Sequence, residues 1–530
     1  MNVKQILFLS VVIFNAINLI GQTPVSTGNY IPTKGTTYAG EGSGNQGKNN
    51  VYIGKDSGKG TNFNSSDNVF IGSDSGITTL GGSRNIFLGA LSGKLNKAGG
   101  DNIFLGYKSG EENVNGFRNI YIGKNSGAKR VGYSDNLFIG HNSGSSSIYG
   151  RNNIFLGHNS GVDSSGEYNI FLGHGSGGNT VGNNNTFIGT NSGKEATGSR
   201  NLFMGVRAGM ENKTGTQNIF IGYEAGEQSE GGTRNTFIGN YSGKNNTAGI
   251  ENIFLGDNTG FANTTGRQNS FIGFNSGQSN TEGSGNVFLG LSTGRYNVDG
   301  SQNVFLGNGS GSSNIDGNGN VFLGFLSGQR NVDGRGNVFL GKGSGISNVT
   351  GSNNVFLGKN LGANETGDDK LYISNSDTNT PLIYGDFESN FLTVNGKFTI
   401  GTEQMPTTIG SEDISFYKLF VKGGLLTEEV RVKTDWADYV FDANYYIRPL
   451  DELEQFIKLN KHLPNIPSSK TVKENGLELG DMMRLQQEKI EELTLYTIQQ
   501  HKELEAQKEK NNILESRLKR LESIISKIDN

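Results

Sequence analysis

The sequence predicts a mainly β protein: a β-solenoid of about 19 coils, then a β-rich junction, then a C-terminal parallel coiled coil. Three observations lead to this prediction. A unit of about 17 residues recurs from Asn50 to about Gly362, most copies hold three apolar residues between an asparagine and a glycine, and a heptad spacing runs from Met483 to Ile528. Such regularity indicates one structural unit stacked on itself.

Each repeat follows the template N-x-F-[IL]-G-x-x-S-G, with a looser polar x-x-N-x-x-G-x-x after it. The first step is 18 residues, three steps between Asn153 and Asn201 are 16 residues, and all others are 17. The leading asparagine stands at positions 50, 68, 85, 102, 119, 136, 153, 169, 185, 201, 218, 235, 252, 269, 286, 303, 320, 337 and 354.

The apolar triplet predicts a short strand. Successive strand side chains point to opposite faces, so Ile103 and Leu105 share one face and Phe104 takes the other. The two glycines of the motif, Gly106 and Gly110 in this copy, suit corners with positive φ or close backbone approach. We expect the Ile/Leu pairs to fill the coil interior and the Phe ladder to be covered by two further chains around a common axis. The alternative is a monomeric solenoid wide enough to bury both faces.

The repeat resembles the head repeats of trimeric autotransporter adhesins, whose shorter N-S-V-A-I-G-type unit forms a trimeric β-roll. The similarity covers roughly residues 45 to 365 and implies a homotrimer with an adhesive role. Two departures are the longer repeat and the phenylalanine at a position where that family has a small residue.

Residues 1–22 read as a signal peptide, with Lys4 followed by an apolar run from Ile6 to Ile20. An uncleaved anchor is the alternative. Residues 23–48 are rich in Gly, Thr, Ser and Asn and are expected to be a flexible lead or an irregular first coil, and residues 49–367 form the solenoid. Export predicts a secreted or cell-surface protein, and the absence of cysteine excludes disulfides.

Residues 368–416 are expected to cap the last coil and form a β-rich junction. Leu371–Ile373 and Leu382–Gly385 predict two capping strands, and Asn395-Gly396 is a hairpin signal. A chaperone-like α+β domain is predicted over residues 417–480.

Within that domain, Leu419–Gly424 and Thr427–Val432 predict a strand pair, and Trp436–Phe441 predicts one more strand. A helix is expected to begin at Pro449, because proline and acidic residues favour a first helical turn. The segment His462–Pro467 is expected to be extended.

Residues 481–530 are expected to form a coiled coil. Positions a are Met483, Ile490, Thr497, Leu504, Asn511, Leu518 and Ile525, and positions d are Gln486, Leu493, Gln500, Gln507, Leu514, Leu521 and Ile528. Nine of these fourteen are apolar, and three pairs of opposite charge at g and e′ favour parallel chains.

The stretch from Tyr417 to the end resembles the C-terminal intramolecular chaperone domains of phage tailspikes and endosialidases, in the diverged form found on secreted Bacteroidetes repeat proteins. The residues that carry the resemblance are Lys418–Gly424, Trp436–Phe441, His462–Ser468 and Lys489–Leu493. The phage domains cleave themselves with a serine in an S-D-x-R-x-K-type motif. Here Val432–Trp436 lacks that serine, so self-cleavage is not expected, although Lys433 and Thr434 offer a substitute pair.

Composition gives no sign of an enzyme. The net charge is −4, which indicates no basic surface for nucleic acid, and the sequence holds no H-x-x-x-H, nucleophile elbow or phosphate loop. We therefore expect no catalytic residues, no cofactor and no membrane span in the mature chain. The first functional hypothesis is a fibre that binds glycans or cell surfaces multivalently. The alternatives are a non-binding spacer or coat fibre and a phage-tail-fibre-like receptor-binding protein.

One candidate metal site stands out. His141, His158 and His174 occupy the same position in three consecutive coils, directly after the first corner glycine, and are expected to stack along one edge. Imidazoles spaced in this way could share a divalent metal. The alternative is that this variable position holds ordinary surface residues.

Overall fold

The computed structural model describes residues 35–528, except 130, 131, 148, 377 and 379. The predicted signal peptide and residues 23–34 of the predicted lead lie outside the described residues. The chain divides into two compact units, one ending at Asn395 and the other beginning at Gly396. This boundary falls inside the predicted 368–416 junction.

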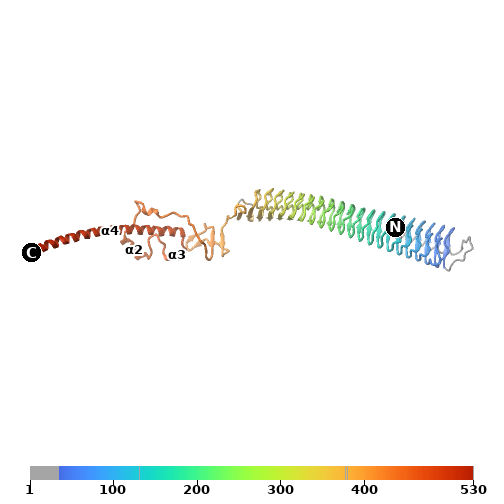
Figure 1. Ribbon diagram of the computed structural model, residues 1–530, viewed down its shortest axis with the longest axis horizontal. Helices are drawn as coiled ribbons and strands as arrows, with labels where there is room; N and C mark the ends of the chain where they lie inside the picture. Colours follow the sequence, from blue (N-terminus) through green and yellow to red (C-terminus); the bar gives the residue numbers. More distant parts are fainter. Residues whose placement is uncertain (1–34, 130–131, 148, 377, 379, 529–530) are drawn as a thin grey trace. The chain divides into compact units, whose positions relative to one another are not determined.

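The first unit is a β-solenoid with one three-residue strand in each predicted repeat (Figure 1). These strands are β2 (Val51–Ile53), β3 (Val69–Ile71), β4 (Ile86–Leu88), β5 (Ile103–Leu105), β6 (Ile120–Ile122), β7 (Leu137–Ile139), β8 (Ile154–Leu156), β9 (Ile170–Leu172), β10 (Thr186–Ile188), β11 (Leu202–Met204), β12 (Ile219–Ile221), β13 (Thr236–Ile238), β14 (Ile253–Leu255), β15 (Ser270–Ile272), β16 (Val287–Leu289), β17 (Val304–Leu306), β18 (Val321–Leu323), β19 (Val338–Leu340) and β20 (Val355–Leu357).

The strands form a parallel sheet in full register. Phe104 of β5 pairs with Tyr121 of β6, for example, so that equivalent positions of successive repeats stack in columns. The stack is slightly longer than the predicted 19 coils. β1 (Thr37–Ala39) pairs in parallel with β2, and β21 (Lys370–Ile373) pairs in parallel with β20. Because β1 lies within residues 23–48, at least that part of the predicted lead is an irregular first coil.

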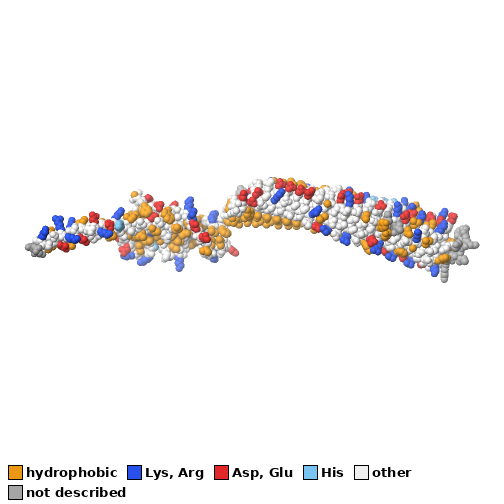
Figure 2. All heavy atoms as spheres, viewed as in Figure 1, with side chains coloured by type: hydrophobic (Ala, Val, Ile, Leu, Met, Phe, Trp, Pro, Cys, Tyr) orange, Lys and Arg blue, Asp and Glu red, His pale blue; other side chains and the backbone are white. Residues whose placement is uncertain are grey.

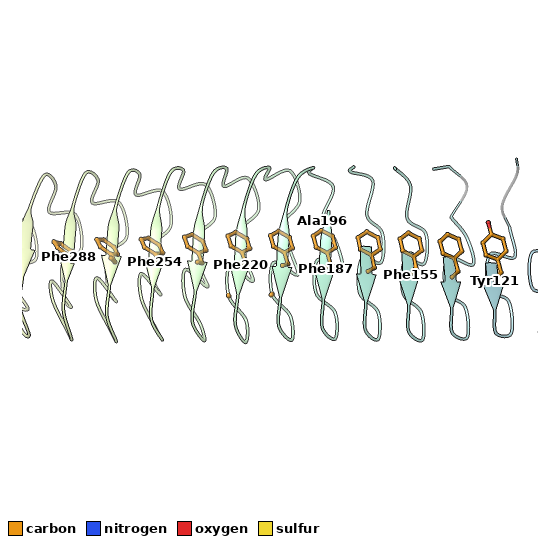
Figure 3. Close-up of a cluster of buried hydrophobic side chains, with 14 of the residues drawn as sticks. Tyr121, Phe155, Phe187, Ala196, Phe220, Phe254 and Phe288 are labelled. Atoms are coloured by element: carbon orange, nitrogen blue, oxygen red, sulfur yellow. The ribbon is translucent and has the colours of Figure 1, made fainter. Parts of the chain in front are cut away.

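The aromatic residue of each repeat forms the core of the solenoid. Every one from Tyr52 to Phe356 is at most 1% exposed. From Phe70 to Phe356 neighbouring ring centroids lie 4.6 to 5.0 Å apart and the rings are nearly parallel. Figure 3 shows the rings in single file inside the coils. The expectation that the Phe ladder faces outward and the Ile/Leu pairs face inward is therefore wrong, although the predicted alternation is correct.

The narrowness of the coil explains this reversal. The second corner glycine of each repeat packs directly against the aromatic ring of the same repeat. Gly110 has φ +59°, and a Cβ added there would lie 2.5 Å from the Phe104 ring. The space between strand and corner therefore holds one flat ring and cannot hold two branched aliphatic side chains. The prediction that these glycines serve positive φ and close approach is confirmed.

Polar side chains complete the interior as continuous ladders. The leading asparagine accepts a hydrogen bond at Oδ1 from the backbone N–H of the next leading asparagine, as Asn102 does from Asn119 at 3.0 Å. Its Nδ2 donates to a glycine carbonyl across the same coil, as in Asn102 to Gly116 at 2.8 Å. The serine before the corner glycine donates to the carbonyl of the aromatic residue in the next coil, as in Ser109 to Tyr121 at 2.9 Å. Buried amides and hydroxyls are costly without such partners, so these ladders explain why Asn and Ser recur.

The three 16-residue coils are one residue shorter than the others, and the shortening falls at the same place in each. In a 17-residue coil, Asn113 stands three residues before Gly116, and its Nδ2 donates to that glycine's carbonyl. In the shorter coils the corresponding residues, Ser164, Thr180 and Ala196, stand only two residues before the glycine. The strands nevertheless stay in register, with Ile154 beside Ile170.

The last coil is closed by the two predicted capping strands. β22 (Ile383–Asp386) pairs antiparallel with β21, and Lys370 forms a 3.0 Å ion pair with Asp386 across this pair. β23 (Phe391–Val394) pairs antiparallel with β22. The predicted Asn395-Gly396 hairpin is wrong, because these two residues connect the two units and β23 does not pair with β24.

The strands of the second unit differ in position from those predicted. β24 (Phe398–Ile400) pairs in parallel with β27 (Leu419–Val421), and β25 (Thr408–Ile409) pairs antiparallel with β26 (Glu412–Asp413). β27 lies where a strand was predicted, but its partner is β24 and not the segment 427–432, which has no strand. Residues Asp438–Phe441 form a 3₁₀ helix, η1, where a strand was predicted; its Val440 is buried.

Three α-helices follow. α2 (Leu450–Asn460) begins directly after Pro449, as predicted, and α4 (Leu479–Ile528) begins at the predicted start of the long helix. α3 (Ser469–Asn475) was not predicted; Ser468 caps it by accepting a hydrogen bond from the Thr471 backbone N–H. Over the residues the structure describes, no helix is both long and apolar enough to cross a bilayer.

Candidate functional site

An apolar stripe runs along the outer face of the solenoid sheet. It consists of the residues on either side of each buried aromatic, which point away from the core and are half-buried or exposed. Hydrophobic side chains gather in a continuous band along part of the solenoid in Figure 2. The most exposed members of the stripe, 38–43% exposed, are Ile86, Ile139, Met204, Ile219, Ile238, Ile253, Ile272, Val287 and Leu289.

Charged residues line one edge of this stripe over the first coils. From Asp67 to Asp135 the position before the leading asparagine alternates between aspartate and arginine, and these residues pair between neighbouring coils. The Arg84 guanidinium forms a two-pronged ion pair with Asp101, and Arg118 forms the same pair with Asp135. The hydrogen bonds from Arg84 lower the pKa of the Asp101 carboxyl. The charged residues of this edge are thus paired with one another, whereas the apolar stripe beside them is not covered by any other described part of the chain.

A second apolar surface lies on α4. Every described residue from Thr497 to Lys527 is exposed. The predicted a and d positions in this part include Leu504, Leu514 and Leu518, which are 53–58% exposed. A helix with no packed face is marginal in water, and a repeating apolar seam is typical of a helix that pairs with others. The heptad seam therefore lies uncovered in the single chain.

The first half of α4 is anchored by a buried carboxylate. Glu488 is 3% exposed and accepts hydrogen bonds from Tyr439 and from Asn465, and Lys489 lies 2.7 Å away. Burial acts to raise the pKa of Glu488, but the hydrogen bonds from Lys489, Tyr439 and Asn465 outweigh it and lower that pKa. This carboxylate thus ties η1 and the segment before α3 to the long helix, which is a structural role.

The substitute pair for self-cleavage is not assembled. Lys433 and Thr434 are both exposed and lie in a segment without regular secondary structure. Within the described part of the chain, no hydrogen bond joins them. The expectation that this region does not cut itself stays a prediction.

The three histidines form a column, as predicted. The ring centroids of His141, His158 and His174 are separated by 5.0 Å at each step, and the last two rings are tilted by only 16°. Stacked rings direct their nitrogen lone pairs side by side, whereas a metal ion needs ligands that converge. Among the residues described, no group of three or more His, Cys, Asp or Glu side chains is arranged to hold a metal ion.

A cluster of buried charges was missed by the sequence reasoning. Glu224 and Glu227 are 4% and 2% exposed, and each forms ion pairs with both Arg207 and Lys244. These four residues belong to three consecutive coils. A signal was present in the sequence, because Arg207 and Glu224, and likewise Glu227 and Lys244, are opposite charges that stand one repeat apart in the same column.

No family model, no curated protein and no solved structure matches the chain.

Proposed function

We propose that this protein is a secreted or surface-displayed homotrimeric fibre that adheres to cell surfaces or glycans through many weak contacts. The observation that carries this proposal is the apolar stripe of the solenoid, which extends over roughly 90 Å at about 4.8 Å per coil. Soluble monomers rarely leave so long an apolar surface uncovered. A second copy of the chain is the occupant that fits, because it presents the same side chains at the same spacing.

The seam on α4 supports the same assignment. It lies on the other unit, it is also apolar and unpartnered, and its heptad spacing is that of helices that associate in parallel. Two surfaces that each need copies of the same chain point to one oligomer. Three copies is the number that the resemblance to adhesin heads implies.

Adhesion is favoured over a pure spacer by the variety of the exposed columns. The core positions are nearly invariant along the solenoid, whereas the position after the first corner glycine varies among Lys, Ser, Ala, Tyr, His, Thr, Val, Asn, Asp, Phe and Leu. A spacer needs no such chemical variety on its edge. Repetition along a trimer would multiply weak contacts into useful avidity.

Mass photometry at micromolar concentration tests the assembly. Trimers are expected, and a stable monomer would end the proposal. A triple aspartate variant on the stripe should dissociate the oligomer, while a control with three aspartates on a different face of the same coils should not. The stripe variant carries Leu289→Asp, Leu306→Asp and Leu323→Asp, and the control carries Val298→Asp, Ile315→Asp and Val332→Asp.

Glycan-array and cell-binding assays on the assembled protein then separate adhesion from a spacer role. Binding that is lost when the trimer is dissociated supports adhesion. A trimer that binds no surface in either assay would leave the spacer as the better assignment.

A further inference from the structure

A shallow hollow lies on the edge of the solenoid where four consecutive coils contribute aromatic, amide, acidic and aromatic side chains in turn. These residues are Tyr223, Asn240, Asp257 and Phe274, and each follows the first corner glycine of its coil. The hollow has a volume of about 450 Å³ and is also lined by Tyr241 and Asn258. Tyr223 and Phe274 are 40% and 49% exposed, so their rings are available to a ligand.

The polar floor of the hollow is fixed by hydrogen bonds between coils. The Tyr223 backbone N–H donates to Asn240 Oδ1 at 3.1 Å, and the Asn240 backbone N–H donates to Asp257 Oδ1 at 2.8 Å. Asn240 Nδ2 donates to Asp257 Oδ2 at 3.3 Å. A carboxylate has about four lone-pair positions, so Asp257 keeps acceptor capacity toward solvent after these two bonds. The amide and the carboxylate are thus held in place before any ligand arrives.

The buried charge cluster adjoins the two tyrosines at one end of this hollow. In the part of the solenoid that the structure describes, Glu224 and Glu227 are the only buried acidic residues. The Tyr223 phenol donates to Glu224, and this hydrogen bond and the negative charge of Glu224 raise the pKa of the phenol. The Tyr241 ring stands edge-on to Tyr223 at 5.3 Å, and Lys244 Nζ lies 5.4 Å from the Tyr241 centroid.

Buried ion pairs are a weak source of stability, because the desolvation of the charges offsets their attraction. The Phe, Asn and Ser ladders already specify the register of these coils. The cluster of four charges occurs in only three of about 20 coils, so a general role in stability does not explain it. Its specific effect is to hold Tyr223 and Tyr241 in place at one end of the hollow.

We propose that this hollow binds a short neutral oligosaccharide, an assignment that rests on the adhesive role proposed above and names its ligand class. Exposed aromatic rings offer flat apolar surfaces for the C–H faces of sugar rings, and a fixed amide and carboxylate accept and donate hydrogen bonds to hydroxyl groups. Three coil steps separate Tyr223 from Phe274, which is roughly 14 Å at about 4.8 Å per step. This span suits an extended chain of a few sugars.

Two other ligand classes fit less well. A quaternary ammonium needs several rings around one point, whereas Tyr223 and Phe274 stand at opposite ends of the hollow. An acidic sugar would place its carboxylate beside Asp257, which like-charge repulsion disfavours. The neutral oligosaccharide is the class that uses both rings and both polar groups.

The test uses the full-length, assembled protein and a panel of neutral oligosaccharides of about two to four hexoses, presented on an array and then titrated in solution. Sialylated oligosaccharides and choline chloride serve as comparison probes. Phe274→Ser and Asp257→Asn are each expected to weaken binding about tenfold or more, which corresponds to about 1.4 kcal/mol. Phe325→Ser is the matched control, because Phe325 occupies the same column and is 46% exposed, but its neighbours in that column are Asn308 and Lys342 and not an acid or a second ring.

Neutral oligosaccharide binding that is weakened by Phe274→Ser and unchanged by Phe325→Ser would support the proposal. Equal losses in the two variants, binding of choline or sialylated sugars in place of neutral ones, or no binding by folded protein would overturn it. Mass photometry of the same samples keeps the two proposals apart. A trimer that binds no sugar refutes only the hollow, and a monomer refutes only the fibre, because all the lining residues belong to one chain.

Discussion

Replacing one buried ring provides the most direct test of how the solenoid is built. In Phe254→Ala, a side chain that is fully buried is removed from the middle of the aromatic column. Its ring stacks on Phe237 at 4.8 Å and on Phe271 at 4.9 Å, and both contacts are lost. Truncation of a buried phenylalanine costs about 3–5 kcal/mol, and the loss of two stacking partners places this site toward the upper end.

Because each coil contacts mainly its neighbours, the loss should be greatest near the substitution. Hydrogen exchange followed by mass spectrometry is the suitable assay, since it reports the stability of each segment separately. Amide protection in the coils that begin at Asn235, Asn252 and Asn269 is expected to fall by roughly two to three and a half powers of ten. The coils near β2 should exchange as in the unaltered protein.

Ile253→Ser is the matched control, because it alters the adjacent residue on the outer face. Ile253 is 43% exposed, and the next coil already carries Ser270 at this position. Exchange within the single chain should therefore change little, with a free-energy difference of about 0.5 kcal/mol or less. If Ile253→Ser destabilised these coils more than Phe254→Ala, the assignment of the aromatic column as the core would be refuted.

Four further outcomes are expected. Gly260→Ala should lower the melting temperature more than Gly319→Ala. Both glycines have positive φ, but only a Cβ at Gly260 would meet an aromatic ring, which adds an overpacking cost of about 1–3 kcal/mol. Equal shifts in the two variants would contradict this. The pKa of the Asp101 carboxyl is lower in the folded than in the unfolded protein, so its ion pair with Arg84 stabilises the fold above the unfolded pKa of about 4. This stability is lost as the pH falls through the folded pKa. Arg84→Gln should therefore make the melting temperature depend less on pH between about 2 and 5. Zinc should shift the melting temperature equally in the unaltered protein and in His158→Asn, and a larger shift in the former would establish the histidine column as a metal site. Removing the second unit should leave folded but misassembled repeats, and correctly formed trimers without it would show by mass photometry that it does not register the chains.

The sequence was informative wherever a pattern repeats. The strand positions, the corner glycines and the period of the stack follow from the template, because 19 copies average out the irregularities of any one coil. The start of α4 and the start of α2 after Pro449 were also predictable, since heptad spacing and helix-start residues are local signals.

Periodicity alone could not predict which face of each strand points into the coil. Alternation separates Phe104 from Ile103 and Leu105, but it does not state which face lies inside. The deciding fact is the gap between strand and corner, which accepts one flat ring against Gly110. The pairing of β24 with β27 was missed for a related reason, because which strands become neighbours depends on contacts across the whole unit.

The candidate hollow was missed because it arises from neighbours in space that are one repeat apart in sequence. Tyr223, Asn240, Asp257 and Phe274 look like unrelated surface residues when the chain is read in order. Aligning the repeats in columns places them side by side, and the same alignment shows the opposite charges of Arg207 and Glu224, and of Glu227 and Lys244, one repeat apart.

The in-register asparagine and aromatic ladders also allow the length of the solenoid to change by whole repeats during evolution. The core ladders join equivalent residues of neighbouring coils, so a gene rearrangement that adds or removes whole repeats would form the same asparagine and aromatic contacts between the coils that it brings together. The reach of the molecule would change by about 4.8 Å per repeat, while the strands that close its end stay the same. Selection could thus adjust how far this protein extends by copying units, without having to improve any single side chain.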